Sequence, residues 1–267
     1  MQADIRVISA LGGYPVAVPT AITVQSSMGV QDVHPLSPEL IRQQLLAVLG
    51  DAPIQAIKIG MLATAPIVNT VASTLRPFLL GHQNVPVILD PIMLSTSGHE
   101  LLSEQGRRDL LAHLLPLATL ITPNLPEFEC LKRIEPAFID KFRSDDCRIP
   151  IEGGHACRIP AESGHACRVL VKGGHADATD TLYIYTRTRD GIIGKPEATF
   201  APSAFVQTRN THGTGCTLSS AIATLMAQGL TLREAIAQAK EFLTRALRQG
   251  VDDARWPGHG PAFISLD

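Results

Sequence analysis

No apolar run in the 267-residue sequence approaches the length of a membrane-spanning helix, which argues against an integral membrane protein. Residues Met1–Arg6 also lack the basic start and the long apolar middle of a secretory signal peptide. Acidic and basic residues nearly cancel, with a formal net charge of −2. Neither nucleic acid nor an anionic membrane surface is therefore expected as a partner.

Cysteine is scarce, and the chain contains an odd number of these residues, five. Without a signal peptide, an odd count indicates reduced thiols rather than a disulfide framework, so we expect a cytoplasmic protein. What the sequence does have is apolar content: 45% of its residues are hydrophobic. This length and composition suit one large α/β domain or two small ones with a sizeable core.

Segments rich in β-branched and apolar residues alternate with segments of helical periodicity. Ser37-Pro38 and the capping box Thr231–Glu234 mark helix starts, and Gly50 and Gly250 mark helix ends. The expected strands are residues 16–24, 56–59, 85–89, 120–122 and 169–172, with a hairpin at 182–185 and 191–193. The expected helices are residues 38–49, 65–80, 103–114, 218–226 and 232–248. This alternation predicts parallel βαβ units with right-handed crossovers.

Polar residues occur at the ends of four expected strands: Lys58, Asp90, Asn124 and Lys172. If the strands are parallel, these residues meet at the carboxyl edge of the sheet, where α/β proteins bind ligands. For any one position, the preference of such residues for turns is the favoured explanation. Four successive occurrences favour a ligand site.

A glycine motif, Asn210-Thr211-His212-Gly213-Thr214-Gly215-Cys216-Thr217-Leu218, precedes an expected apolar helix. The first N–H groups of a helix have no acceptor within it, and glycines let an anion approach them. The motif can therefore hold a phosphate or an oxyanion. Cys216 would lie at the helix start, where a thiol loses its proton more easily. The alternative is a loop before a core helix, with Cys216 as an inert small apolar side chain.

Residues 147–176 contain three tandem ten-residue units, each with a cysteine followed eight positions later by a histidine. Thiolate and imidazole are good zinc ligands, but this spacing matches none of the usual zinc-ligand pairs. Pro150 and Pro160 argue against a central strand in the first two units. We interpret these two units as a duplicated loop insertion and assign only the third unit, which contains Lys172, to the sheet.

Several segments in order resemble the hydroxymethylpyrimidine/phosphomethylpyrimidine kinases of thiamine biosynthesis, which belong to the ribokinase-like superfamily. The glycine motif is similar to their anion-hole motif, and Cys216 replaces the aspartate found in most of the superfamily, which points away from sugar kinases. The other matching segments are residues 2–4, 10–12, 58–62, 89–93, 122–127 and 171–175, together with Gln25. The resemblance extends to about residue 260 and fails between about 133 and 166.

The resemblance implies a role for each matching residue. The residues that would line the pyrimidine pocket are Asp4, Thr23, Gln25, Met61 and Ile92. Those that would bind ATP are Asn124, Glu127, Lys172, Thr211, His212 and Thr214. The carboxylates expected at a Mg²⁺ site are Asp90 and Glu127. Those that would act in catalysis are Lys172 as the phosphate-neutralising cation, Gly213 and Gly215 in the anion hole, and Cys216 as the base.

The implied fold is α/β: a single ribokinase-like domain over residues 1–267, with a mostly parallel central sheet between helical layers and the repeat insertion at about 134–166. The implied reaction is ATP- and Mg²⁺-dependent phosphorylation of 4-amino-5-hydroxymethyl-2-methylpyrimidine and of its monophosphate, by a homodimer. The alternatives are a pyridoxal or pyridoxine kinase and an inactive pseudokinase that still binds a ligand.

The N-terminus departs from the family pattern. The family has a further strand and a Ser-Gly-Gly-Ala-Gly loop directly before Gln-Ala-Asp, whereas this sequence starts at Met1-Gln2-Ala3-Asp4. A truncated product, a mis-set start codon or a degraded copy would explain this departure. We expect an exposed sheet edge and a less closed substrate pocket as consequences.

Overall fold

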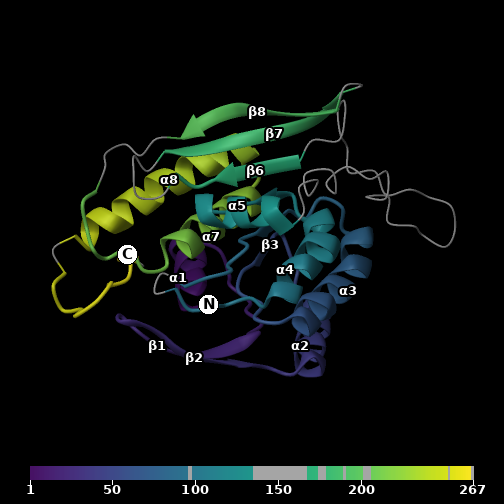
Figure 1. Ribbon diagram of the computed structural model, residues 1–267, viewed down its shortest axis with the longest axis horizontal. Helices are drawn as coiled ribbons and strands as arrows, with labels where there is room; N and C mark the ends of the chain where they lie inside the picture. Colours follow the sequence, from purple (N-terminus) through teal and green to yellow (C-terminus); the bar gives the residue numbers. More distant parts are fainter. Residues whose placement is uncertain are drawn as a thin grey trace, which may run out of the picture.

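A six-stranded sheet lies at the centre of the computed structural model (Figure 1). The structure describes residues 1–95, 98–134, 167–173, 179–188, 191–200, 206–251 and 253–265. In spatial order the strands are β3 (Ile57–Ile59), β4 (Val87–Leu89), β5 (Leu120–Ile121), β6 (Cys167–Val171), β7 (Asp180–Thr188) and β8 (Gly191–Phe200). The first four are mutually parallel, whereas β7 and β8 are antiparallel to their neighbours, which confirms a mostly parallel sheet with a hairpin.

Helices connect the parallel strands, as the alternating pattern predicts. In the described part of the chain between β3 and β6, the helices and helical turns are α3 (Ala65–Gly81), α4 (Glu104–Asp109), η1 (Leu110–Leu114), η2 (Leu115–Leu117) and α5 (Leu125–Ile134). The helix expected at 103–114 begins as predicted, because the Ser103 side chain accepts a hydrogen bond from the Gly106 N–H at 3.2 Å. It is α-helical only to Asp109, and a π-helical turn continues it.

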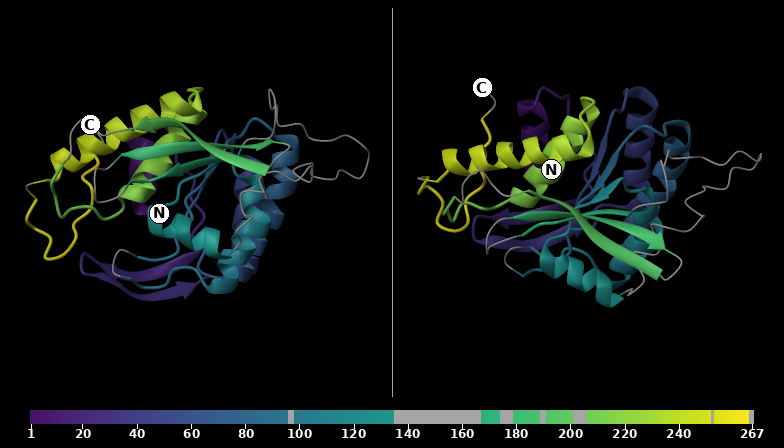
Figure 2. Two further views of the ribbon diagram at one scale, coloured as in Figure 1. Left: turned by 45° about the horizontal axis from the view of Figure 1, so that its top comes forward. Right: turned by 90° about the horizontal axis from the view of Figure 1, so that it is seen from above.

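The sheet is buried on both faces because the side chains of its short strands alternate between two cores. Val87 and Leu89 pack in one core with α2 (Pro38–Asp51), α3 and η1. Ile88, between them, packs in the other core with α7 (Thr214–Ala227) and α8 (Leu232–Gln249). Figure 2 shows the sheet between these two helical layers. This arrangement confirms the three-layer α/β fold.

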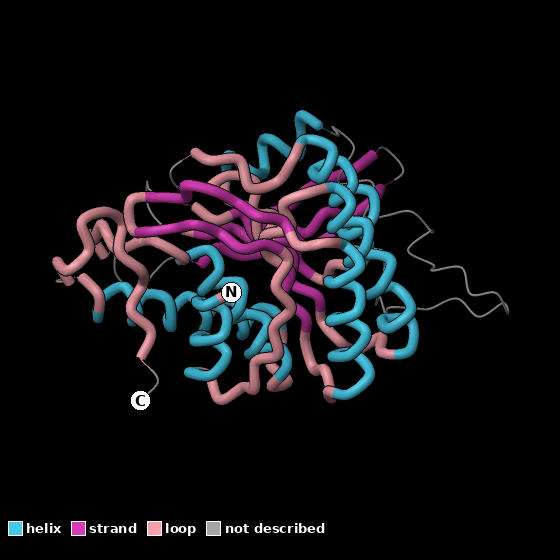
Figure 3. Tube along the Cα trace, turned by 90° about the horizontal axis from the view of Figure 1, so that it is seen from below, coloured by secondary structure: helices cyan, strands magenta, loops and turns pink. Residues whose placement is uncertain are grey.

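The N-terminal region differs from the sequence-based prediction. The strand expected at 16–24 is found as β1 (Ala21–Ser26), which pairs antiparallel with β2 (Gly29–Pro35) in a separate two-stranded sheet (Figure 3). Pro19 cannot donate a backbone hydrogen bond, so it suits the approach to β1 rather than a strand interior. Helix α1 (Gln2–Ala10) was not predicted, and only Val7 of it is buried.

The expected insertion falls almost entirely outside the described residues, and so do Cys147 and Cys157 of its first two repeat units. The third unit forms β6, which confirms its place in the sheet. None of the helices in the described ranges has the length and apolarity that a membrane crossing requires.

Candidate active site

Three of the four polar residues expected at strand ends, Asp90, Asn124 and Lys172, meet at the carboxyl edge of the sheet, as predicted, whereas Lys58 lies within β3. The Lys172 Nζ donates to Asp90 Oδ1 at 2.9 Å, and the Lys172 backbone N–H donates to the Pro123 carbonyl oxygen at 2.9 Å. Asn124 pairs with Lys172 in an isolated parallel bridge beyond β5 and β6. These contacts place the ends of β4, β5 and β6 within direct reach of one another.

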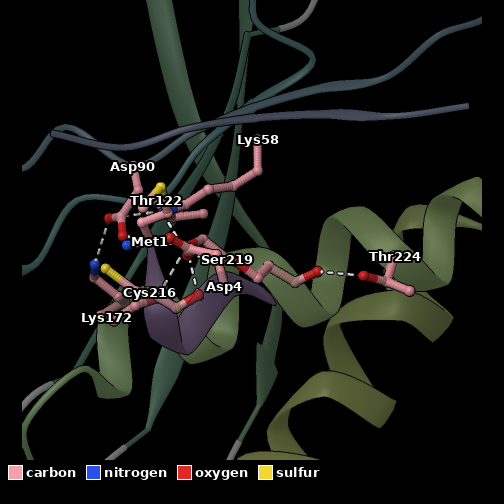
Figure 4. A network of polar contacts seen from close by, with 11 residues as sticks. Met1, Asp4, Lys58, Asp90, Thr122, Lys172, Cys216, Ser219 and Thr224 are labelled. Atoms are coloured by element: carbon pink, nitrogen blue, oxygen red, sulfur yellow. Dashed lines mark hydrogen bonds and ion pairs between the residues drawn. The ribbon is translucent and has the colours of Figure 1, made fainter. Parts of the chain in front are cut away.

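Asp90 is almost fully buried, with 1% of its side chain exposed, and its carboxylate is surrounded by donors (Figure 4). In addition to Lys172, Thr122 Oγ1 donates to Oδ1 at 3.3 Å and Ser219 Oγ donates to Oδ2 at 3.1 Å. A buried carboxylate is stable only when it is paired and hydrogen-bonded in this way. Asp90 therefore links β4 to β5, β6 and α7, and both of its oxygens already have protein partners.

Glu127 and Asn124 form a reciprocal capping pair at the start of α5. The Asn124 N–H donates to Glu127 Oε2 at 2.8 Å, and the Glu127 N–H donates to Asn124 Oδ1 at 2.8 Å. Burial raises the pKa of Glu127; the Lys172 charge opposes this shift and the Asp90 charge adds to it. Because Asn124 bridges to Lys172 and donates to the Glu127 carboxylate, Glu127 lies at the same edge of the sheet as the Asp90–Lys172 pair. The pair has a structural role in capping as well as the role in ATP binding that the resemblance implies.

Of the two carboxylates expected at a Mg²⁺ site, Glu127 fits the ion better. Its carboxylate accepts backbone hydrogen bonds from Asn124 and Met93 and retains free lone pairs, whereas Asp90 is engaged by three charged or hydroxyl side chains. No cluster of three or more His, Cys, Asp or Glu side chains suited to a metal occurs among the described residues. Proteins commonly hold Mg²⁺ through one or two carboxylates together with phosphate oxygens and water.

The glycine motif forms the start of α7. Gly213 is the N-cap residue with φ of 80°, a left-handed conformation that favours glycine. Within the described part of the chain, the N–H groups of Gly215 and Cys216 have no backbone acceptor. A Cβ on Gly215 would lie 3.2 Å from Lys172 Nζ. The missing side chain therefore lets Lys172 reach the helix start, where free N–H groups and a cation favour an anion.

Cys216 is a half-buried residue in the first turn of α7. Burial raises the pKa of its thiol; Asp90 and Asp4 add to this shift, whereas the Lys58 charge opposes it. The expectation that the helix start makes this thiol more acidic is therefore wrong for the arrangement seen here. Desolvation and two nearby carboxylates outweigh the helix dipole, whose effect is small by comparison.

Asp4 and Lys58 form a second ion pair beside Cys216, and the sequence predicted Lys58 only as one of the polar residues of the ligand-binding edge. The Lys58 Nζ donates to Asp4 Oδ1 at 2.9 Å, and Ser220 Oγ donates to the same oxygen at 2.7 Å. The Met1 amino group lies 2.8 Å from Asp4 Oδ2. Burial tends to raise the pKa of Asp4, but Lys58 and the Met1 amino group lower it to about 2. The Asp4 carboxylate is therefore ionised at neutral pH.

The hairpin β1–β2 brings Gln25 to the glycine motif. Gln25 Nε2 lies 2.8 Å from His212 Nε2, and Thr23 Oγ1 donates to Gln25 Oε1 at 3.4 Å. Burial lowers the pKa of His212, and His259 adds to this effect, so a neutral imidazole accepts the Gln25 N–H. His212 was expected to bind nucleotide, and its ring in this structure contacts the residue expected to bind the pyrimidine.

The other expected pocket residues lie at the ends of β3 and β4. The Met61 carbonyl oxygen accepts a hydrogen bond from Thr20 Oγ1 at 2.7 Å. Ile92 lies beside Gly60, since a Cβ on that glycine would be 3.7 Å from Ile92 Cδ1. A small cavity of about 20 Å³ lies between the hairpin and the glycine motif, beside the Gln25–His212 contact. Its lining includes Gln25, Met28, Ser95, His212 and His259.

Thr211 and Thr214, also expected to bind nucleotide, flank Gly213. The Thr214 N–H donates to the Thr211 carbonyl oxygen at 3.3 Å, which helps to close the turn before α7. The side chains that sequence reasoning missed are Thr122, Ser219 and Ser220. One available signal was the Ser219-Ser220 pair, because two adjacent hydroxyls interrupt a mainly apolar helix and both are buried.

A family model described as phosphomethylpyrimidine kinase matches residues 1–262. The chain belongs to the phosphomethylpyrimidine kinase family. A hydroxymethylpyrimidine/phosphomethylpyrimidine kinase of Staphylococcus aureus is 34% identical over 272 residues, covering 98% of this chain and 86% of that protein. A phosphomethylpyrimidine kinase structure from Clostridium difficile is 29% identical, covers 92% of each chain and has a TM-score of 0.63. An ADP complex of Bacillus subtilis pyridoxal kinase is 27% identical, covers 100% of this chain and 92% of that chain, and has a TM-score of 0.66.

Membership of this family confirms the resemblance and makes the protein a kinase with a ribokinase-like fold. The site of this family member thus contains the glycine motif and two lysine–aspartate pairs, Lys58–Asp4 and Lys172–Asp90.

Proposed function

We propose that this protein transfers the γ-phosphoryl group of ATP to the hydroxymethyl group of 4-amino-5-hydroxymethyl-2-methylpyrimidine, and then phosphorylates the resulting monophosphate, in thiamine diphosphate biosynthesis. The observation that carries this proposal is the start of α7, where Lys172 and the free N–H groups of Gly215 and Cys216 meet. Phosphoryl transfer depends chiefly on positioning and on neutralising charge, which cations and backbone donors supply.

In the proposed reaction the pyrimidine hydroxyl oxygen forms a bond to the γ-phosphorus while the bond to the β,γ-bridging oxygen breaks. ADP leaves with the bonding electron pair, and the hydroxyl proton passes to the Cys216 thiolate, which becomes a thiol. Lys172 neutralises phosphate charge, and the α7 N–H groups bind the equatorial oxygens. Asp90 holds the Lys172 ammonium 2.9 Å away, so this cation is already in place before the nucleotide arrives.

Glu127 would hold Mg²⁺ with the phosphates, with Asp90 close to it. Bound Mg²⁺ neutralises charge on the β- and γ-phosphoryl oxygens. Asn124 fixes the Glu127 carboxylate through the backbone bond at 2.8 Å, so the residue needs little reorganisation to act as a ligand. The expected homodimer is also part of the proposal. The exposed apolar residues Ile22, Val24 and Met28 on the β1–β2 hairpin are a surface that a second copy would cover.

A competition assay tests the substrate. The purified chain with Mg²⁺ and ATP receives equal amounts of hydroxymethylpyrimidine and pyridoxal, and mass spectrometry measures both phosphorylated products. The proposal predicts preferential phosphorylation of the pyrimidine. Preferential formation of pyridoxal phosphate would favour the pyridoxal kinase alternative, which the likeness to the Bacillus subtilis pyridoxal kinase supports. Binding of either compound without turnover would favour a pseudokinase.

A further inference from the structure

Lys58 is a buried cation to which the proposed reaction assigns no role. It lies at the centre of β3, and only 8% of its side chain is exposed. Burying an ammonium group costs several kcal/mol unless a partner compensates, and an apolar residue would avoid this cost. Asp4 is the partner, through the contact of 2.9 Å to its Oδ1. The buried Lys58 ammonium is therefore stabilised by Asp4, at a cost that an apolar residue would not incur.

The geometry brings the Lys58–Asp4 pair to the face of α7 that carries Cys216. Ser220 Oγ donates to Asp4 Oδ1, the oxygen that also accepts from Lys58. Ser220 follows Cys216 by four residues, so both side chains lie on the same face of the helix. Figure 4 shows Lys58 joined to Asp4, and beside them Cys216, whose carbonyl oxygen accepts from Ser219 Oγ at 3.2 Å.

The charged groups that act on the Cys216 thiol come from four elements. Asp4 comes from α1 and Lys58 from β3, while Asp90 and Lys172 follow β4 and β6. The charge of the Met1 amino group also favours the Cys216 thiolate. Lys58 is the strongest of the influences that favour the thiolate, and both aspartates disfavour it. Burial tends to lower the pKa of Lys58, but Cys216, Asp4 and Asp90 raise it above the ordinary value, so the amine stays charged.

We propose that Lys58 is the charge partner of Cys216, a positioning residue that stabilises the thiolate through which Cys216 accepts the substrate proton. The thiol first releases its proton to solvent, and the resulting thiolate then takes the proton of the attacking hydroxyl and becomes a thiol again. Asp4 pairs with the Lys58 ammonium at 2.9 Å, and its own negative charge opposes the thiolate. This inference rests on the proposed role of Cys216 as the base.

Alkylation of Cys216 by iodoacetamide tests the proposal without any substrate, because only the thiolate reacts. Its rate is measured as a function of pH by mass spectrometry of the peptide that contains Cys216. One pKa unit changes the thiolate fraction by about tenfold below the pKa, so K58M is expected to slow alkylation by about tenfold. D4N is expected to accelerate it, K58R to retain the wild-type rate, and K58M/D4N to return close to that rate. Cys130 in the same samples is the internal control.

Equal alkylation rates in wild type and K58M, or shifts of the same sign in K58M and D4N, would overturn the proposal. If circular dichroism shows that K58M does not fold, the test uses D4N and K58R instead. An unchanged alkylation rate in D4N, or a much slower rate in folded K58R, would contradict the role of Lys58. The test also separates the two proposals. Opposite shifts in thiol reactivity without any kinase turnover would contradict only the proposed function, whereas turnover with unshifted alkylation would contradict only the role of Lys58.

Discussion

Lys172 and Asp90 form an ion pair with 2.9 Å between Nζ and Oδ1, in which the lysine is 14% and the aspartate 1% exposed. Breaking such a buried pair from one side leaves an uncompensated charge and costs about 3–5 kcal/mol. We therefore predict that K172M lowers the free energy of unfolding by about that amount. The double variant D90N/K172M should lose less than the sum of the single variants, as measured by urea denaturation. Additive losses would show that the pair is not coupled.

The buried pair Asp180–Lys240 fixes the chain immediately after Lys172. Lys240 Nζ lies 2.6 Å from Asp180 Oδ2, and the Gly173 N–H donates to Asp180 Oδ1 at 3.0 Å. A Cβ on Gly173 would collide with the Thr179 backbone. We predict that K240M destabilises the fold by about 3–5 kcal/mol in urea titrations, whereas K132M, at an exposed lysine, changes it by less than about 0.5 kcal/mol. Similar losses in both variants would contradict this account.

The ionisation of Asp4 makes the free energy of unfolding depend on pH in the acidic range. Its pKa is about 2 in the folded protein and 3.8 without interactions, so its contribution is present above pH 3.8 and is lost as the pH falls towards 2. A shift of this size corresponds to about 2 kcal/mol. As the pH falls from 3.8 to 2, D4N should therefore lose about 2 kcal/mol less of its free energy of unfolding than the wild type loses. D51N is the control at an exposed aspartate, and a wild-type acid dependence in D4N would disprove the assignment.

Glu127 combines a helix cap with a proposed metal ligand, and two variants separate these roles. N124A removes the side-chain half of the cap and should cost about 1 kcal/mol of stability. E127Q retains an acceptor for the Asn124 N–H but loses the negative charge. It should therefore raise the Mg²⁺ concentration needed for half-maximal activity, with little change in stability. An unchanged Mg²⁺ requirement in E127Q would exclude Glu127 as a ligand.

The convergence of Asp90, Asn124 and Lys172 could be predicted from the sequence because strand ends and helical periodicity are local signals. The hairpin β1–β2 was missed as a separate sheet, since its strands are largely exposed and lack a clear alternation of apolar residues. The Lys58–Asp4–Ser220 contacts join residues 54 and 216 positions apart, which no local pattern reveals. The raised pKa of Cys216 depends on burial and on the charges brought together by folding, so the helix start alone predicted the wrong direction.

Phosphorylation of the pyrimidine at the site that contains Lys172 is tested by a product assay on wild type, K172M and K132M. Each purified protein receives saturating ATP, Mg²⁺ and hydroxymethylpyrimidine, and the phosphorylated pyrimidine is measured. One phosphorylated product per ADP is expected in the wild type. K172M should lower kcat/KM by about 100-fold or more because it removes a preorganised charge from the phosphate site, and K132M should match the wild type. Absence of product in the wild type, or equal rates in wild type and K172M, would contradict the assignment of this site.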